Sequence, residues 1–173
     1  YRRVIEALEK IQENQLDSVV TKARLIDVEE VRGGYYYGSI IEELEKIPED
    51  RVKSIVTAAN NIAEGKNWSG ASYSPIIKAI GNIPKDRLES IVNATKLVSI
   101  GKDWCGSDCG SIIEALATIQ DDKLISMITA ANRIAEGKPW DGSDYARVIE
   151  ALEKIQENQL DSVVTKARLI DVE

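Results

Sequence analysis

Residues 145–173 read YARVIEALEKIQENQLDSVVTKARLIDVE, and residues 1–29 read YRRVIEALEKIQENQLDSVVTKARLIDVE. The two stretches agree at 28 of 29 positions, and the single difference is Ala146 in place of Arg2. Internal repetition decides an architecture before any local motif does. We therefore interpret the chain as a repeat protein.

The repetition continues through the whole chain with a period of 36 residues. This period places Tyr1, Tyr37, Tyr73, Cys109 and Tyr145 in one column without insertion or deletion. Positions within a unit are numbered from 1 to 36 below. We expect one continuous series of four complete repeats and a partial fifth, at residues 1–36, 37–72, 73–108, 109–144 and 145–173.

Each unit carries two apolar stripes with helical spacing. Unit positions 4, 5, 8 and 11 share one face of a first helix, and positions 16, 19, 20, 23 and 26 share one face of a second. Two short amphipathic helices joined in a hairpin cannot bury their apolar faces alone, so neighbouring hairpins must stack. The sequence thus predicts an all-α protein, an α-solenoid of two-helix hairpin repeats.

Glycine marks the predicted end of the second helix in three units. Gly65, Gly101 and Gly137 share this position, where a left-handed backbone ends many helices. The first unit has Glu29 instead, and its glycines come only at positions 33 and 34. We therefore expect an atypical first repeat, with a second helix extended through Val31.

A tryptophan follows three residues after each of these glycines, as Trp68, Trp104 and Trp140. An indole buries a large area, so we expect these side chains to fill the seam between one hairpin and the next. The alternative is a role in stacking against a ligand.

Composition argues against several functions. The chain carries a net charge of -7 and no histidine. This charge opposes binding to nucleic acid, and the commonest general base and nitrogen ligand for metals is missing. Its carboxylates fall mostly beside lysine on exposed helix faces, without an isolated pair for acid and base catalysis. We predict a protein without enzymatic activity, cofactor, metal site or membrane span.

Two cysteines lie in one predicted turn between units. Cys105 and Cys109 together replace the residue types of the sister units. We predict a disulfide between them, and the alternative is two free thiols. A disulfide would favour an oxidising compartment, outside the cell or at its surface, over the cytoplasm.

The second helix varies between units at positions 21, 24 and 25. A repeated slot whose side chain changes along a solenoid is a candidate interaction surface, although unconstrained drift would look the same. The candidate residues are Thr21, Arg24, Thr57, Asn60, Asn61, Asn93, Lys96, Thr129, Asn132 and Arg133.

The near-copy at 145–173 indicates a larger period of 144 residues, in a natural array or an engineered concatemer. We expect a segment of a longer tandem array that acts as a structural scaffold or protein-binding element and stacks end to end or forms a fibre. Its partners would be copies of itself, adjacent blocks or another protein. The alternative is a nucleic-acid-binding repeat protein that reads bases through the second helices. The candidate end-to-end interface is Leu160, Val163, Val164 and Ile170.

Overall fold

The computed structural model describes residues 2–26, 35–66, 68–99 and 104–170, and within these ranges it contains helices and no strands. The predicted all-α fold is confirmed. The α-helices are α1 (Arg2–Leu8), α2 (Glu13–Ala23), α3 (Tyr35–Glu45), α4 (Glu49–Ala63), α5 (Tyr73–Gly81), α6 (Leu88–Leu97), α7 (Gly106–Thr118), α8 (Leu124–Ala135), α9 (Gly142–Glu153) and α10 (Leu160–Arg168). Four 3-10 turns, η1 (Gly70–Ser72), η2 (Lys85–Arg87), η3 (Asp121–Lys123) and η4 (Glu157–Gln159), each lead into the next α-helix.

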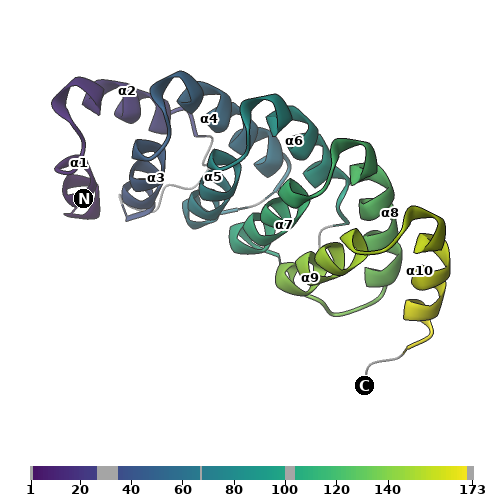
Figure 1. The fold of residues 1–173 in the computed structure, drawn as a ribbon. Helices are drawn as coiled ribbons and strands as arrows, with labels where there is room; N and C mark the ends of the chain where they lie inside the picture. The colour runs from purple at the N-terminus through teal and green to yellow at the C-terminus, as the bar shows by residue number, and fades with distance from the viewer. Residues whose placement is uncertain (1, 27–34, 67, 100–103, 171–173) are drawn as a thin grey trace.

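Consecutive helices form five pairs, which we number 1 to 5 from α1–α2 to α9–α10. The first helices pack in the order α1, α3, α5, α7 and α9, and the second helices follow in a parallel order from α2 to α10. Figure 1 shows the resulting curved stack, with the first helices along the inside of the curve and the two termini at opposite ends.

One apolar core runs through all five pairs. Its members include the positions that the helical stripes predict, and the isoleucines of unit position 4 in pairs 2, 3 and 4 are at most 1% exposed: Ile40, Ile76 and Ile112. Burial of apolar surface is the main favourable term in folding, so the stack is stabilised chiefly by contact between neighbouring pairs.

The pairs are of two types. In pairs 2 and 4 the second helix ends at unit position 27, at Ala63 and Ala135, and we call these the long pairs. In pairs 1, 3 and 5 it ends at position 23, 25 or 24, and we call these the short pairs. Gly65 and Gly137 follow the long helices with φ of 73° and 75°, as their position predicts, whereas Gly101 lies outside the described residues.

The extended helix predicted for the first repeat is not found. Helix α2 ends at Ala23, and the backbone then tightens into turns in which the amides of Leu25 and Ile26 bond to carbonyls three residues back. These turns bring Ile26 into the core, where it is 3% exposed. Residues 27–34 lie outside the described residues.

Glycine permits close approach between neighbouring pairs. A Cβ on Gly106 would lie 1.9 Å from the backbone oxygen of Ser72, and one on Gly142 would lie 2.3 Å from the Cβ of Asp108. Both glycines open the first helix of a pair, so a side chain at either position would force two pairs apart.

Two arginines also join neighbouring pairs. Arg51 and Arg87 occupy unit position 15. Each donates to two backbone carbonyls at the C-terminal end of the first helix of the following pair, and for Arg87 these are the carbonyls of Ala117 and Ile119. The Nε of Arg87 also donates to Asp121 at 2.9 Å. The Nε of Arg51 is buried and has no hydrogen-bond partner among the described residues.

Candidate interaction surface

The three tryptophans form a chain of hydrogen bonds across the seams. The indole N–H of Trp68 donates to the backbone carbonyl of Trp104 at 3.0 Å, and that of Trp104 donates to the carbonyl of Trp140 at 2.8 Å. Trp104 is buried, and its ring meets that of Tyr145 edge to face with centroids 5.6 Å apart. Trp68 and Trp140 are half-buried against the core. The indoles of Trp68 and Trp104 thus join one pair to the next, whereas Trp140 contributes its backbone carbonyl to this chain of bonds.

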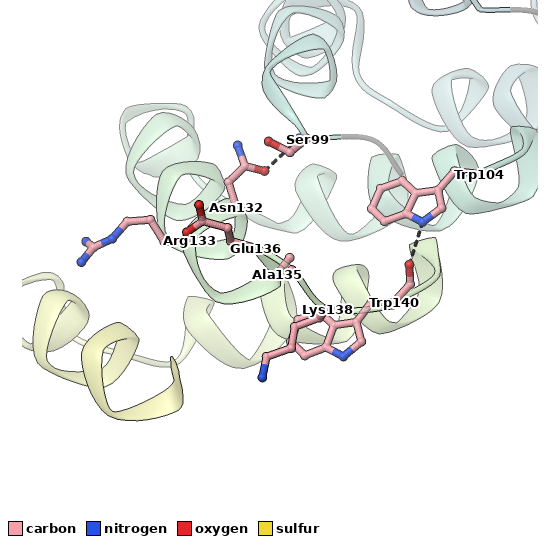
Figure 2. Close-up of a pocket in the computed structure, with 9 residues that line it drawn as sticks. Ser99, Trp104, Asn132, Arg133, Ala135, Glu136, Lys138 and Trp140 are labelled. Atoms are coloured by element: carbon pink, nitrogen blue, oxygen red, sulfur yellow. Dashed lines mark hydrogen bonds between the residues drawn. The ribbon is translucent and has the colours of Figure 1, made fainter. Parts of the chain in front are cut away.

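A cleft of about 450 Å³ lies beside this seam, between the end of α8 and the loops that follow α6 and α8. Figure 2 shows Trp104 and Trp140 on one side of it and Asn132 on the other, with Arg133 extending away from the tryptophans. Polar groups from Ser99 and Glu136 also line it. The carboxamide of Asn132 is already engaged by the protein, and two charged lining residues are paired as well, Arg133 with Asp161 and Glu136 with Arg168.

The asparagines at unit position 24 hold neighbouring pairs together. Asn60 donates to the carbonyl of Leu25 at 2.8 Å, and Asn132 donates to the carbonyl of Leu97 at 2.9 Å. Each bond satisfies a carbonyl at the end of the preceding second helix, where no intrahelical partner exists. Both residues were predicted to face a partner molecule. In the structure they connect a long pair to the short pair before it.

Asn132 makes two further bonds. Its side-chain oxygen accepts from the backbone N–H of Ser99 at 2.9 Å and from the hydroxyl of Tyr145 at 2.6 Å. The Tyr145 side chain is fully buried, and burial raises the pKa of its hydroxyl. One carboxamide therefore links pairs 3, 4 and 5.

The short pairs carry a basic residue at the same position, and it meets the preceding long pair. Lys96 lies 3.5 Å from Glu64, and Arg168 lies 2.8 Å from Glu136. These ion pairs are partly exposed and contribute little stability individually, because water screens them. These ion pairs occur where a short pair follows a long pair. The asparagine bonds occur where a long pair follows a short pair, so the two kinds of junction differ.

The remaining candidates spread over the second helices without forming one site. The hydroxyls of Thr57 and Thr129 bond to their own helix, at Lys53 and Ile125. Arg133 bonds to Asp161 in the next pair at 2.7 Å. Four candidates are exposed on the second helices or directly after one, and no bond between them is seen in the described residues: Thr21, Arg24, Asn61 and Asn93.

Exposed apolar residues on this surface were missed by the sequence reading. Leu25, Leu97 and Leu169 occupy unit position 25 of the short pairs and are more than half exposed. Ile125 is also exposed, at unit position 17 of pair 4. The leucines recur at every second unit, which could have revealed them, whereas Ile125 has no repeated signal.

The predicted disulfide is not formed, and both cysteines are free thiols. Cys105 is exposed at the N-cap of α7, where its side chain and that of Asp108 form a reciprocal capping box. Cys109 lies one turn along the helix and is buried in the slot that Tyr145 fills in pair 5. The two thiols therefore have different structural roles, and as free thiols they do not indicate an oxidising compartment.

Asp108 connects this cap to the next pair. Its carboxylate accepts from the backbone N–H of Cys105 at 2.8 Å and from that of Gly142 at 2.9 Å. Burial raises the pKa of this carboxyl, but the hydrogen bonds from Cys105 and Gly142 outweigh it and hold the pKa below its usual value.

The candidate end-to-end interface needs a correction. Leu160 and Val164 are buried, because they face α8 of the preceding pair. Val163 is half-buried, and Ile170 is 63% exposed. Only the latter two residues belong to the surface at the C-terminal end of the stack.

That surface, which we call the C-terminal edge, has five members from α9, α10 and the turns after them. They occupy unit positions 7, 11, 19, 23 and 26 and are all exposed or half-buried: Ala151, Ile155, Val163, Ala167 and Ile170. The same positions in pair 1 hold the same residue types, and all five are buried there: Ala7, Ile11, Val19, Ala23 and Ile26. Helices α3 and α4 cover the copy in pair 1.

The opposite end shows the converse pattern. Ile5 is 55% exposed and Leu16 and Val20 are half-buried, whereas their copies in pair 5 are buried against pair 4. We call these three residues the N-terminal edge.

No helix in the described ranges has the length and apolar character needed to cross a membrane. Among those same residues no group of three or more histidine, cysteine or acidic side chains is placed to hold a metal ion. No protein-family model, no curated protein and no solved structure matches the chain.

Proposed function

We propose that the protein is an α-solenoid with a period of 36 residues and that it acts as a non-enzymatic structural scaffold or protein-binding element. In this proposal it is a segment of a longer tandem array, in which blocks of four units stack end to end. The observation that carries the proposal is the pair of apolar edges, because near-identical copies of both edges are covered inside the same chain.

Recurring junction bonds support the period. The tryptophan bonds join residues 36 apart, and the asparagine bonds join residues 35 apart in both places where they occur. The basic side chains at unit position 24 reach carboxylates 32 residues earlier, again twice. Equal separations along the chain at successive junctions are typical of a solenoid, in which each repeat contacts only its neighbours.

A scaffold is also supported by what the surface residues do. Asn60 and Asn132, two of the candidates for contact with a partner, bond to the protein itself. The base-reading alternative thereby loses its readers at unit position 24 in the long pairs, and the net charge of -7 opposes it further.

The proposal can be tested by continuing the chain in register. A variant that continues after Glu173 with residues 30–173 contains two blocks. We expect one rod about twice as long by small-angle scattering and electron microscopy, with a higher midpoint of thermal unfolding, because each added interface stabilises its neighbours.

The matched control joins the second block out of register, through a flexible glycine-serine linker placed after Glu173. This variant should tumble as two bodies and unfold at the temperature of the single block. If the in-register variant behaves like this control, the two blocks do not form a continuous array and the proposal fails.

A further inference from the structure

We propose that the C-terminal edge is a docking site for a long pair, a helix pair with the residues of α3 and α4, and that it discriminates against a short pair. This inference rests on the proposed function and specifies the partner that the edge accepts. It comes from a surface that the structure shows twice, once covered and once open.

The apolar part of the site is the set of five residues already described. Each keeps its residue type between pair 1 and pair 5, and Ile170, 63% exposed, corresponds to Ile26, which is 3% exposed beneath pair 2. The sequences of the two units differ only at unit position 2, which is not a member of the edge. A pair that fits the surface of pair 1 therefore fits the C-terminal edge.

The polar part of the site selects the type of pair. In both junctions from a short pair to a long pair, an asparagine at unit position 24 donates to the carbonyl of a leucine at unit position 25. Leu169 holds that leucine position in pair 5. A docked long pair brings an asparagine to its carbonyl.

A short pair brings the wrong side chain to this point. Its unit position 24 holds Lys96 or Arg168, and these residues pair with Glu64 and Glu136 of a preceding long pair. Unit 5 has Val172 at the position of those glutamates. A short pair docked here would meet Val172 where its basic residue otherwise meets a glutamate, and it would bring no asparagine to the Leu169 carbonyl.

Head-to-tail contact between two copies of this chain would bring a short pair onto a short pair. The inference therefore predicts that the free chain associates end to end poorly, and that the edge is filled by a long pair from a neighbouring block.

The test compares two extensions of the full chain, equal in length. The long extension continues after Glu173 with residues 30–72, and the short extension continues with residues 30–36 followed by residues 73–108. Coverage is measured by the rate of maleimide labelling of a single introduced thiol, Ile170→Cys. Every copy of Cys105 is replaced by serine in both extended chains, including the copy that residues 73–108 bring into the short extension. Serine keeps a capping hydroxyl at position 105, and Cys109 is buried.

Leu169→Cys provides the matched control site. Leu25, the equivalent residue in pair 1, stays 55% exposed although pair 2 covers the rest of the surface. With the long extension we expect labelling at 170 to slow by about tenfold or more, since buried thiols react only when the structure opens locally, while labelling at 169 stays within about twofold. The short extension should leave both sites within about twofold of the unextended chain.

A rescue variant tests whether the residue at unit position 24 causes the discrimination, or whether the short pair fits the edge poorly for another reason. Lys96→Asn within the short extension supplies the missing carboxamide and should restore protection at 170, whereas Asn60→Ala within the long extension should reduce it. Equal protection by the unaltered long and short extensions would overturn the inference and leave the array proposal standing. No protection by either extension would overturn both.

Discussion

Replacing Asn132 with alanine should destabilise the protein more than any other single change on the surface of the second helices. The side chain makes three bonds, to the Leu97 carbonyl, the Ser99 amide and the Tyr145 hydroxyl. The first two partners are exposed and can bond to water instead, so each loss costs about 0.5 to 1 kcal/mol. The Tyr145 hydroxyl is buried, and its other contact, to the carbonyl of Ile128, is 3.5 Å long.

A buried hydroxyl left without a good partner costs about 1 to 3 kcal/mol, so we expect a total loss near 3 kcal/mol in the free energy of unfolding. For a chain of this length that corresponds to a fall of roughly 6 to 12 °C in the unfolding midpoint. Urea unfolding followed by tryptophan fluorescence measures the change, because Trp104 packs directly on Tyr145.

A double-mutant cycle with Tyr145→Phe isolates the buried bond. Without the hydroxyl, Asn132→Ala should cost only about 1 to 2 kcal/mol, which gives a coupling energy of about 1 to 2 kcal/mol. Arg133→Ala is the neighbouring control and should cost less than about 1 kcal/mol, since it removes a partly exposed ion pair. A coupling energy indistinguishable from zero would refute the assignment of Asn132 as a structural link.

Three further changes test other features of the stack. Gly106→Ala should lower the free energy of unfolding by about 2 kcal/mol or more, because the added Cβ would meet backbone atoms of the preceding pair. Gly65→Ala should lower it by about 1 kcal/mol, because only the left-handed backbone conformation opposes the change. Chemical denaturation of both variants measures the two costs. Lys85 occupies the unit position at which Asp121 accepts from the Nε of Arg87. Lys85→Asp should therefore offer the buried Nε of Arg51 a carboxylate and stabilise the chain by about 1 kcal/mol, and a fall in the unfolding midpoint would contradict this. Burial raises the pKa of the Cys109 thiol to about 12. Above pH 9 the unfolded chain loses this proton first, so Cys109 alone should lower the free energy of unfolding by about 1.4 kcal/mol per pH unit up to pH 12. The difference in slope between the protein and a Cys109→Ala variant measures this contribution separately from that of Tyr145.

Helical periodicity carried most of the information about the fold. The apolar stripes predicted the all-α class and the core residues, because the spacing of buried positions follows directly from helix geometry. The extent of α2 could not be predicted in this way. Its end depends on turns that place Ile26 in the core, and the sequence pattern of helix stops gives no measure of that tertiary contact.

The two types of pair have a sequence signal at unit positions 24 to 28. Units 2 and 4 read NNIAE and NRIAE from unit position 24, whereas units 1, 3 and 5 read RLIDV, KLVSI and RLIDV. The variation at unit position 24 is compatible with a partner-reading surface, but basic residues and asparagine alternate strictly there. In the structure each residue type at this position contacts the same kind of partner in the preceding pair, a leucine carbonyl for asparagine and a glutamate for lysine or arginine. The alternation therefore reflects packing between pairs, and only the structure identifies these partners.

The cysteines show a different limit. Their close spacing suggested a covalent bond, yet one thiol caps α7 and the other fills a core slot. Spacing along a chain does not determine whether two side chains point toward each other, because that depends on where the helix begins.

The tryptophan bonds all run in one direction, since each indole N–H donates to a carbonyl further along the chain. A stack built from such bonds has a polarity, with a donor side and an acceptor side at every seam. Interfaces that continue it must be heterologous, because a twofold interface would place two like sides together. In the proposed array, the rotation from one pair to the next therefore decides between a closed ring and an open filament.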